Sequence, residues 1–310
     1  MNMKTVSIIT PCYNGERYLD RYFQSILRQT YSKLELIFIN DGSTDRTDEL
    51  VEKYRPQLEQ RGILFTYLTQ EKNQGQAAGL NRGLKLFTGE YLTWLDADDE
   101  ITPDCIEKKV QYLQEHPEFQ MVRSDGIYFN EDSKTKKSIA TEQDKHPQNI
   151  FEKLLLVHTY GCCGCYMTTK DLLLKCYPKK DIFESRAGQN WQMLVPAASY
   201  SDCGYIDECL YTVYEHSDSH SRHRRSAQEM YRRWDDFTEI LHRAIAVSKC
   251  NPIQANRMVD ENCARQKFYY AVADNDMKMI RQAYCSMRSC GKATLKETML
   301  WIKYGFLVKK

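Results

Sequence analysis

The sequence lacks any long hydrophobic run, any excess of one charge and any glycine-rich dinucleotide motif. Its longest apolar runs, such as Val6–Ile9 and Leu36–Ile39, have the length of a strand. They fall far below the roughly 20 residues of a membrane-spanning helix. The 43 Lys and Arg against 42 Asp and Glu leave a net charge of +1, which argues against a nucleic-acid partner. We therefore expect a soluble or peripheral protein that binds no nucleic acid.

Cysteine is present, but without the spacing of a zinc site or a disulfide framework. The 12 cysteines are scattered over 310 residues with no leading signal peptide, which predicts reduced thiols in the cytoplasm. The cluster Cys162-Cys163-Gly164-Cys165 has no matching His/Cys pair and predicts buried free thiols. No Gly-x-Gly-x-x-Gly follows the first apolar run, which disfavours a dinucleotide oxidoreductase.

Short apolar runs alternate with amphipathic stretches over about the first 99 residues. This alternation is typical of strand–helix–strand units that build a parallel sheet. The expected strands are Thr5–Thr10, Leu34–Asn40, Ile63–Thr69 and Glu90–Asp96. The expected helices are Arg17–Gln29, Arg46–Gln60 and Gln76–Phe87. Ser43 or Thr44 is the expected N-cap of the second helix.

The rest of the chain divides into a mixed part and a helical part. A helix behind Thr102-Pro103 should end near His116 and be followed by a strand near Met121–Phe129 and a surface loop over Asn130–Gln148. Residues 150–215 contain short mixed elements, whereas helical periodicity predicts four helices over 226–248, 253–273, 276–289 and 293–307. We expect an α/β domain over residues 1–222 and a helical region over 223–310.

The first two expected strands each end in a polar segment that suits a nucleoside. In the first, Tyr13 is placed to stack on a base. In the second, Asp41 is placed to accept a hydrogen bond from a base N–H. An ordinary strand end explains the first segment as well, and a turn with a helix cap accounts for Ser43 and Asp45.

The third and fourth segments suit a diphosphate and a metal ion. Asn73-Gln74-Gly75 opens a helix whose first backbone N–H groups can face a phosphate. Asp96, Asp98 and Asp99 end an apolar strand, where their mutual repulsion favours a cation. Mn²⁺ or Mg²⁺ prefers carboxylate oxygens together with substrate phosphates, and would stabilise the charge on a departing diphosphate. A solvated acidic turn is the alternative.

These four segments together resemble the family 2 glycosyltransferases. The matching stretches are VSIITPCYN, LELIFINDGSTDRT, EKNQGQAAGLNRGL and GEYLTWLDADD. The resemblance covers about the first 100 residues and extends more loosely to about residue 222. It implies a GT-A fold, which is an α/β fold with a mostly parallel central sheet flanked by helices, here with a helical C-terminal extension. It also implies an inverting sugar transfer from a nucleotide-sugar donor, usually UDP-linked.

The resemblance also assigns residues to the donor and the metal. The residues that it places around the nucleoside are Thr10, Pro11, Tyr13, Asp41 and Asn73. Asp96 and Asp98 match the DxD pair, with Asp98 as the direct metal ligand and Asp96 facing the ribose and sugar. Gly75 and Asn81 of the third motif complete the donor site. Leu80 stands where many relatives carry an Arg, so one phosphate or sugar contact is either missing or supplied by the neighbouring Arg82.

The sequence departs from the family where the catalytic base is expected. Gly188-Gln189-Asn190-Trp191 replaces the usual Glu-Asp pair before a Trp, and a neutral amide cannot take a proton from an acceptor hydroxyl. Gln189 and Asn190 are expected to orient the acceptor or donor sugar, and Asp99 and Glu184 are the candidate bases. A catalytically silent nucleotide-sugar-binding or scaffold protein is the alternative.

Two basic segments complete the predicted site and its surroundings. His220 and Arg222, with His216 as a rival, match a segment that relatives return to the metal and diphosphate, although a surface loop without a role explains them equally. The segment from Lys292 to Lys310 holds five Lys against Glu297 and resembles a helix attracted to anionic lipid. A helix docked on its own domain is the alternative.

The resemblance and the basic C-terminal segment together predict sugar transfer to a glycan or lipid-linked glycan acceptor during assembly of a bacterial surface polysaccharide. We expect the protein in the cytoplasm or at the inner face of the plasma membrane.

Overall fold

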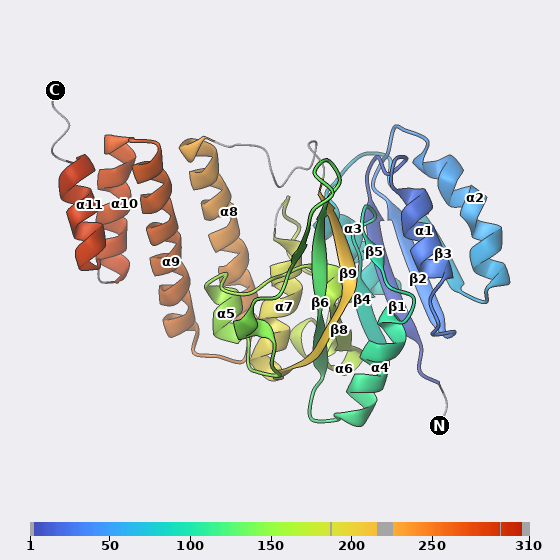
Figure 1. Cartoon of the computed structure of the whole chain (residues 1–310). Coiled ribbons are helices and arrows are strands. Elements are labelled where there is room, and N and C mark those ends of the chain that lie inside the picture. The colour runs from blue at the N-terminus through green and yellow to red at the C-terminus, as the bar shows by residue number, and fades with distance from the viewer. Residues whose placement is uncertain (1–2, 187, 216–225, 292, 306–310) are drawn as a thin grey trace.

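The computed structural model describes residues 3–186, 188–215, 226–291 and 293–305, and it is built around one mixed sheet (Figure 1). The strand order is β3-β2-β1-β4-β8-β6-β9-β5, and β7 pairs with β6. Its parallel half consists of β1 (Val6–Cys12), β2 (Leu34–Asn40), β3 (Leu64–Thr69) and β4 (Tyr91–Trp94). The four strands expected from the apolar runs are therefore confirmed.

The second half of the sheet brings antiparallel pairs. It consists of β5 (Glu100–Ile101), β6 (Met121–Asn130), β7 (Lys136–Ser138), β8 (Tyr166–Thr169) and β9 (Cys203–Glu215). β8 runs antiparallel to both β4 and β6, whereas β9 is parallel to β6. The expected surface loop over residues 130–148 is partly wrong, because β7 forms a hairpin with β6 and Asp144 is buried in a 3-10 turn (Glu142–Asp144).

Seven α-helices belong to this part of the described chain. They are α1 (Leu19–Leu27), α2 (Thr47–Gln60), α3 (Gln76–Leu86), α4 (Cys105–Glu115), α5 (Phe151–Leu155), α6 (Lys170–Cys176) and α7 (Gln189–Tyr200). The expected N-cap of α2 is wrong, because α2 begins at Thr47 behind Arg46. Ser43 and Thr44 instead bind Asn14, each across 2.9 Å, and so join the loops after β1 and β2.

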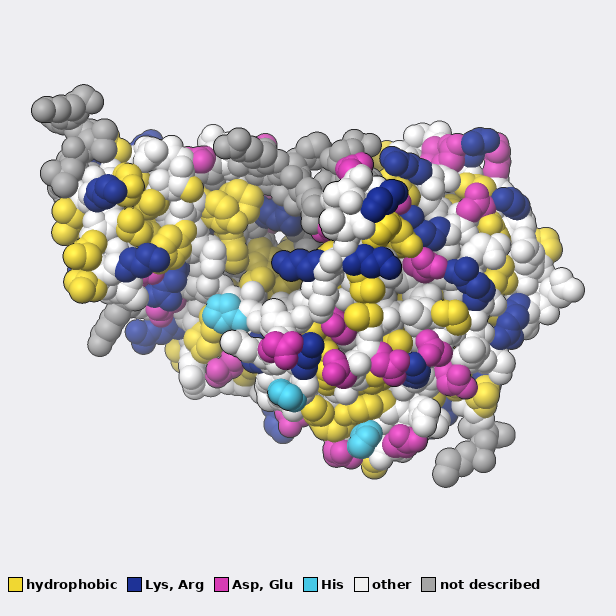
Figure 2. Space-filling view, viewed as in Figure 1, with side chains coloured by type: hydrophobic (Ala, Val, Ile, Leu, Met, Phe, Trp, Pro, Cys, Tyr) yellow, Lys and Arg dark blue, Asp and Glu magenta, His cyan; other side chains and the backbone are white. Residues whose placement is uncertain are grey.

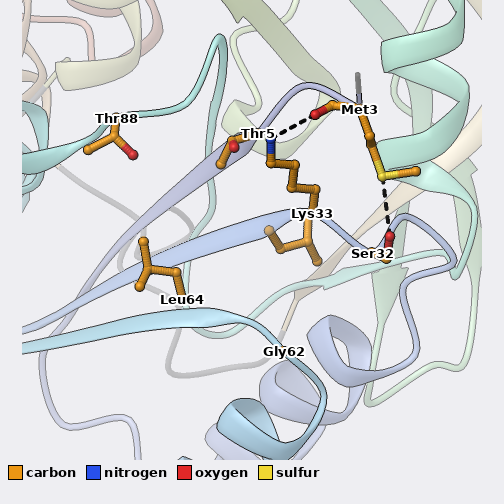
Figure 3. A pocket seen from close by; sticks show the side chains of 8 residues that line it. Met3, Thr5, Ser32, Lys33, Gly62, Leu64 and Thr88 are labelled. Carbon is orange, nitrogen blue, oxygen red and sulfur yellow. Dashed lines mark hydrogen bonds between the residues drawn. The ribbon is translucent and has the colours of Figure 1, made fainter. Parts of the chain in front are cut away.

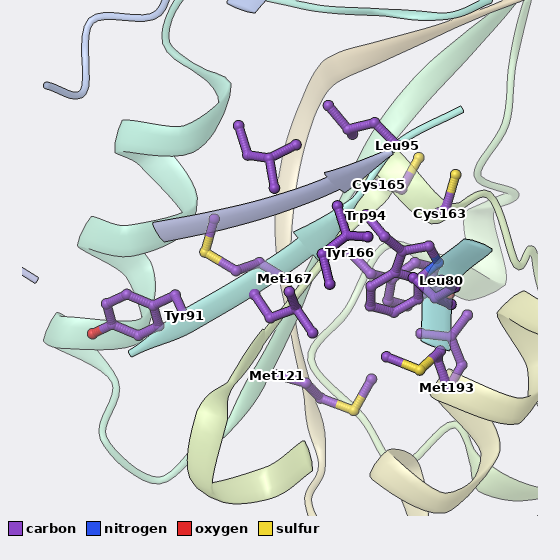
Figure 4. Close-up of a cluster of buried hydrophobic side chains, with 14 of the residues drawn as sticks. Leu80, Tyr91, Trp94, Leu95, Met121, Cys163, Cys165, Tyr166, Met167 and Met193 are labelled. Atoms are coloured by element: carbon purple, nitrogen blue, oxygen red, sulfur yellow. The ribbon is translucent and has the colours of Figure 1, made fainter. Parts of the chain in front are cut away.

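Close packing between α3 and the sheet depends on two glycines. A Cβ added at Gly83 would lie 2.3 Å from Cγ2 of Ile9, and one added at Gly79 would lie 2.8 Å from Cβ of Pro11. Only a hydrogen in place of a side chain permits this approach. On the other side of β4, apolar side chains from β8 and α7 fill the core beneath the site, with the free thiols of Cys163 and Cys165 among them (Figure 4).

The C-terminal helices stand side by side in a row that leads away from the sheet (Figure 1). They are α8 (Ala227–Ala246), α9 (Pro252–Ala273), α10 (Met277–Cys290) and α11 (Leu295–Gly305). The last three share a second apolar cluster around Phe268 and Tyr284, whose ring stacks on Trp301 at 4.5 Å between centroids. None of the described helices is long and apolar enough to cross a membrane.

Candidate active site

A small pocket lies at the carboxyl edge of the parallel strands, where the sequence motifs predict the site. It is formed by the end of β1, the start of α3, the end of β4 and the start of α7. Its lining residues are Pro11, Gln76, Leu80, Trp94, Leu95, Asp96, Gln189 and Asn190. The fold thus brings together two predicted donor-binding residues, Pro11 and Asp96, and both amides of the second-half motif, although Gln189 follows Pro11 by 178 residues and Asp96 by 93.

A larger hollow lies at the opposite edge of the sheet. It has a volume of about 390 Å³ and is lined by residues near the amino ends of β1, β2 and β3, including Met3, Lys33 and Leu64 (Figure 3). Lys33 donates its ammonium to the backbone oxygen of Met3 across 2.8 Å. The predicted site residues do not line this hollow, so we place the candidate site at the carboxyl edge, where ligands bind in open α/β sheets.

The acidic segment after β4 places Asp96 in the pocket, Asp98 near it and Asp99 in the interior. Burial, followed by the charge of Asp98, raises the pKa of Asp96 to about 6. Asp99 is buried, and it accepts hydrogen bonds from the Tyr211 hydroxyl and, across 3.1 Å, from the backbone N–H of Tyr214. Burial and the two neighbouring aspartates also hold the pKa of Asp99 well above its usual range. This geometry favours Asp99 as an anchor for β9 over Asp99 as a base.

Arg21 of α1, which the sequence analysis did not single out, holds the backbone of this acidic segment. Its guanidinium donates to the backbone oxygen of Asp98 across 2.7 Å and to Glu131 across 3.0 Å. The same group lies 3.3 Å from the centroid of the Tyr214 ring. Arg21 therefore joins α1, the β6–β7 turn and β9 to the residue that is predicted to bind the metal.

The chemistry of Asp96 and Asp98 fits a divalent cation. Both are hard oxygen donors, and Asp98 disfavours the ionised form of Asp96. No group of three or more His, Cys, Asp or Glu side chains within the described residues is arranged to hold a metal ion. A cation here would thus take its other ligands from water and substrate, as Mg²⁺ commonly does. The predicted ligand His220 lies outside the described residues, as do His216 and Arg222.

The nucleoside motifs converge on one loop, but two of their residues have structural partners. Asp41 is buried and accepts the backbone N–H groups of Gln74 and Gly75 across 2.8 and 2.7 Å, so it shapes the loop before α3. Thr10 is also buried, with its hydroxyl 2.6 Å from that of Tyr22. Tyr13 is 49% exposed, so its ring face is accessible to a base.

Two amide side chains connect α7 to the acidic segment. Gln189 donates to the side-chain oxygen of Gln76, and Gln76 in turn donates to Asp96 across 3.4 Å. Asn190 accepts the indole N–H of Trp94 across 2.8 Å. Since indole is only a donor, the oxygen of Asn190 must face Trp94, and its amino group remains to donate within the pocket.

The two remaining predicted residues, Asn81 and Glu184, contact each other. The amide of Asn81 is buried and bonds both the backbone N–H and the backbone oxygen of Ile182, across 2.7 and 2.9 Å. Its amino group also lies 3.3 Å from the carboxylate of Glu184. Asn81 thus orients the segment that carries Glu184, and the side chain of Glu184 is exposed.

The segment after Glu184 contributes an arginine that the sequence analysis missed. Arg186 donates to the side-chain oxygen of Asn73 and, across 3.1 Å, to its backbone oxygen. Arg82, one of the two alternatives for a phosphate or sugar contact, donates to the backbone oxygen of Thr69 across 2.9 Å. No local pattern links residue 186 to residue 73, so only the fold reveals this contact.

A family model and several curated proteins match this chain. The model of the family described as Glycosyl transferase family 2 matches residues 7–177. An uncharacterized glycosyltransferase of Haemophilus influenzae is 43% identical over 129 residues, which are 41% of this chain and 48% of the relative. The chain spans less than half the length of the first curated relatives that it matches.

Two solved structures share the fold at low sequence identity. S. aureus TarS 1-349 in complex with UDP has a TM-score of 0.60 and 18% identity, covering 97% of this chain and 78% of that chain. The mannosyltransferase PcManGT from Pyrobaculum calidifontis, in complex with GDP-Man and Mn²⁺, has a TM-score of 0.57 and 18% identity, covering 97% of this chain and 79% of that chain. At these identities the likeness carries the fold alone.

Proposed function

Because this chain belongs to glycosyltransferase family 2 and has the GT-A fold, we propose that it transfers a sugar from a UDP-linked donor to a hydroxyl acceptor with inversion. One observation carries the proposal: Asp96 of the acidic pair, Gln76 at the start of α3 and the α7 amides Gln189 and Asn190 line one pocket on the carboxyl edge of the sheet. We also propose that residues 1–222 form the transferase domain and residues 223–310 a helical extension that shapes access for the acceptor.

The donor would lie across the loops after β1, β2 and β3. Tyr13 offers an exposed ring for the base, and Asp41 holds the loop that contains Asn73 and Gly75 beneath the nucleoside and diphosphate. TarS with UDP and PcManGT with GDP-Man and Mn²⁺ support a nucleotide-sugar donor by fold analogy. Pro11 and Leu80 give the pocket its apolar walls.

The transfer would proceed by direct displacement at the anomeric carbon. The acceptor hydroxyl oxygen forms the new bond to that carbon while the bond from carbon to the diphosphate oxygen breaks, which inverts the configuration. The hydroxyl proton passes to a base, for which Glu184 is our choice because Asp99 is buried beneath the site with protein partners on both oxygens. Gln189 and Asn190 would hold the sugar by hydrogen bonds.

A divalent cation, Mn²⁺ or Mg²⁺, held by Asp98 and Asp96 would supply positive charge for the departing diphosphate. The residues of the chain carry the remaining tasks. Arg21 fixes the backbone at Asp98, and Gln76 orients the carboxylate of Asp96.

Donor turnover by the purified chain tests this proposal. We expect release of UDP from at least one UDP-sugar in the presence of Mn²⁺, and a loss of about 100-fold or more in Asp98→Asn. Asp132→Asn, at an exposed carboxylate, is the matched control. Binding of UDP without turnover of any donor, with or without acceptor glycans, would favour the silent nucleotide-sugar-binding alternative.

A lipid-linked glycan is the acceptor class that the C-terminal helices favour, because α11 exposes an apolar face. Leu295, Met299 and Ile302 are 76%, 62% and 47% exposed and recur at helical spacing, with Lys296 and Lys303 beside them. Figure 2 shows hydrophobic and basic side chains together at this end of the molecule. We propose contact with an anionic lipid surface, whereas Leu300 and Trp301 dock the helix on its neighbours.

Sedimentation with lipid vesicles tests the contact. We expect binding to vesicles that contain phosphatidylserine, weaker binding to neutral phosphatidylcholine vesicles, and a loss of binding in the double variant Leu295→Ser/Met299→Ser. Ile253→Ser removes an apolar side chain that is 82% exposed on α9 and serves as the control. Equal binding by the double variant and the wild type would refute the contact.

A further inference from the structure

We propose that Arg186 is a further donor-binding residue, whose guanidinium contacts the diphosphate of the bound nucleotide sugar. The inference rests on the proposed function, because it assigns a contact to the donor in that site. Neither the motifs of the first 100 residues nor the second-half amide motif includes Arg186.

The position of the guanidinium is fixed from two directions. It donates to both the side-chain and the backbone oxygen of Asn73. A Cβ added at Gly75, where φ is +98°, would lie 3.3 Å from Cδ of Arg186 and 3.7 Å from its Nε and Nη1. The guanidinium therefore lies against the backbone of the Asn73–Gly75 loop, and the absence of a side chain at Gly75 leaves the room for it.

The segment that carries Arg186 is itself tied to α3. The buried amide of Asn81 bonds the backbone of Ile182 in both directions, and the side chain of Gln192 bonds the backbone of Phe183 in both directions. These four hydrogen bonds hold the chain four and three residues before Arg186. The backbone before Arg186 is thus held in place, so the position of its side chain is more restricted than that of an ordinary surface arginine.

Arg186 retains the capacity to bind an anion. Arginine has five N–H donors, and the bonds to Asn73 use two of them. Within the described ranges, no carboxylate forms an ion pair with Arg186, and the side chain is exposed. A diphosphate matches the planar guanidinium in charge and geometry. Gln76, one residue beyond Gly75, lines the pocket together with Asp96, so the donor sugar and the guanidinium would flank the same short stretch of chain.

The charge of the site gives this contact a specific role. Asp96 and Asp98 repel a diphosphate. A metal ion that they held would offset this repulsion only on the side of the site where the two carboxylates lie. Arg186 would add positive charge from the Asn73–Gly75 side. The contribution of Arg186 to the affinity for a ligand should therefore grow with the number of phosphates on that ligand and should be absent for uridine alone.

Calorimetric binding of UDP, UMP and uridine in the presence of Mn²⁺ tests the inference. We expect Arg186→Gln to weaken UDP binding by about 10- to 100-fold, UMP binding by less, and uridine binding not at all. Arg186→Lys should be intermediate, because an ammonium keeps the charge but not the fork. Arg61→Gln is the control, since this arginine donates to the backbone oxygen of Gln29 away from the loop. Melting curves without ligand should be alike for all variants.

The outcomes separate the inference from the proposed function. If wild-type protein binds UDP and Arg186→Gln binds it equally well, the diphosphate contact is refuted and the proposed function stands. If Arg186→Gln weakens uridine and UDP by the same factor, Arg186 only shapes the Asn73–Gly75 loop and the inference is again refuted. If wild-type protein binds no uridine nucleotide, the proposed UDP donor fails first.

Discussion

The indole N–H of Trp94 donates a 2.8 Å hydrogen bond to Oδ1 of Asn190, and this bond decides what Asn190 offers to a ligand. The bond spans 96 residues of sequence and joins the end of β4 to the start of α7. Because the indole fixes the amide oxygen, the amino group of Asn190 is the part that remains for the pocket. We therefore predict that Asn190, at the position of the usual base, offers a hydrogen-bond donor to a ligand.

Asn190→Asp tests that assignment with almost no change of shape. The carboxylate still accepts the bond from Trp94, but it loses both N–H donors and adds a negative charge beside Asp96. We therefore expect an unchanged melting temperature and a fall in donor turnover of about 10-fold or more. Gln254→Glu, an equal charge change at an exposed position of α9, is the control. Higher turnover in Asn190→Asp would mean that the position favours a base after all.

Arg21→Lys tests the support of the acidic segment. Lysine keeps the charge but lacks the planar guanidinium, which donates to Asp98 and Glu131 while its face covers the Tyr214 ring. Since residues behind a metal ligand commonly change metal affinity by 10- to 100-fold, we expect about 10-fold more Mn²⁺ to be needed for half-maximal turnover. Arg55→Lys, at a surface ion pair with Glu52, should leave this Mn²⁺ requirement unchanged. The idea fails if both variants titrate alike.

The sequence predicted the elements whose signals are local. Apolar runs located β1, β2, β3 and β4, and helical periodicity located α8, α9, α10 and α11. The runs reflect strands such as β1 and β2 that are buried on both faces, whereas the helical periodicity reflects helices that bury one face. The short strand Lys136–Ser138 was missed, since three exposed polar residues carry no such pattern. This segment forms a strand because it pairs with β6.

The site was predictable in its motifs but not in its cross-chain contacts. Asp96 and the amides Gln189 and Asn190 were expected at the site, and the fold places all three at one pocket. The contacts of Arg21 and Arg186 span 77 and 113 residues of sequence. Such pairs are set by the packing of separate elements, so neither spacing nor composition could indicate them. The roles of all these residues stay predictions.

Gly83→Ala tests the close approach of α3 to β1. Within a helix, this change alone would stabilise the fold by about 1 kcal/mol. The added methyl would lie 2.3 Å from Cγ2 of the buried Ile9, and overpacking costs about 1–3 kcal/mol. We expect net destabilisation by urea unfolding, with lower turnover because Pro11 lines the pocket above this contact. Lys85→Ala on the exposed face of α3 should change stability by less than about 0.5 kcal/mol. Equal urea midpoints for Gly83→Ala and the wild type would contradict the steric argument.

Asp144 makes the stability of the folded protein depend on pH, and this dependence can be assigned to its one carboxyl group. Its burial alone would raise its pKa, but hydrogen bonds from Thr141 and Thr159 and the charge of the buried Arg123 together lower it below the usual value. A pKa that is lower in the folded state means that the unfolded chain binds the proton more tightly. The stabilisation by ionised Asp144 is therefore fully present above the unfolded pKa of about 3.9, and it is lost as the pH falls through the folded pKa.

Asp144→Asn should remove this dependence, since the amide does not titrate. We expect the variant to be less stable than the wild type at pH 7, because Arg123 would lose its charge partner in the core, and the gap in urea midpoint to narrow steadily from about pH 4 downward. Asp132→Asn, at an exposed carboxylate in the β6–β7 turn, is the matched control and should follow the wild type at every pH. A gap that stays constant down to the acid transition would show that the Arg123–Asp144 contact contributes packing but no charge interaction.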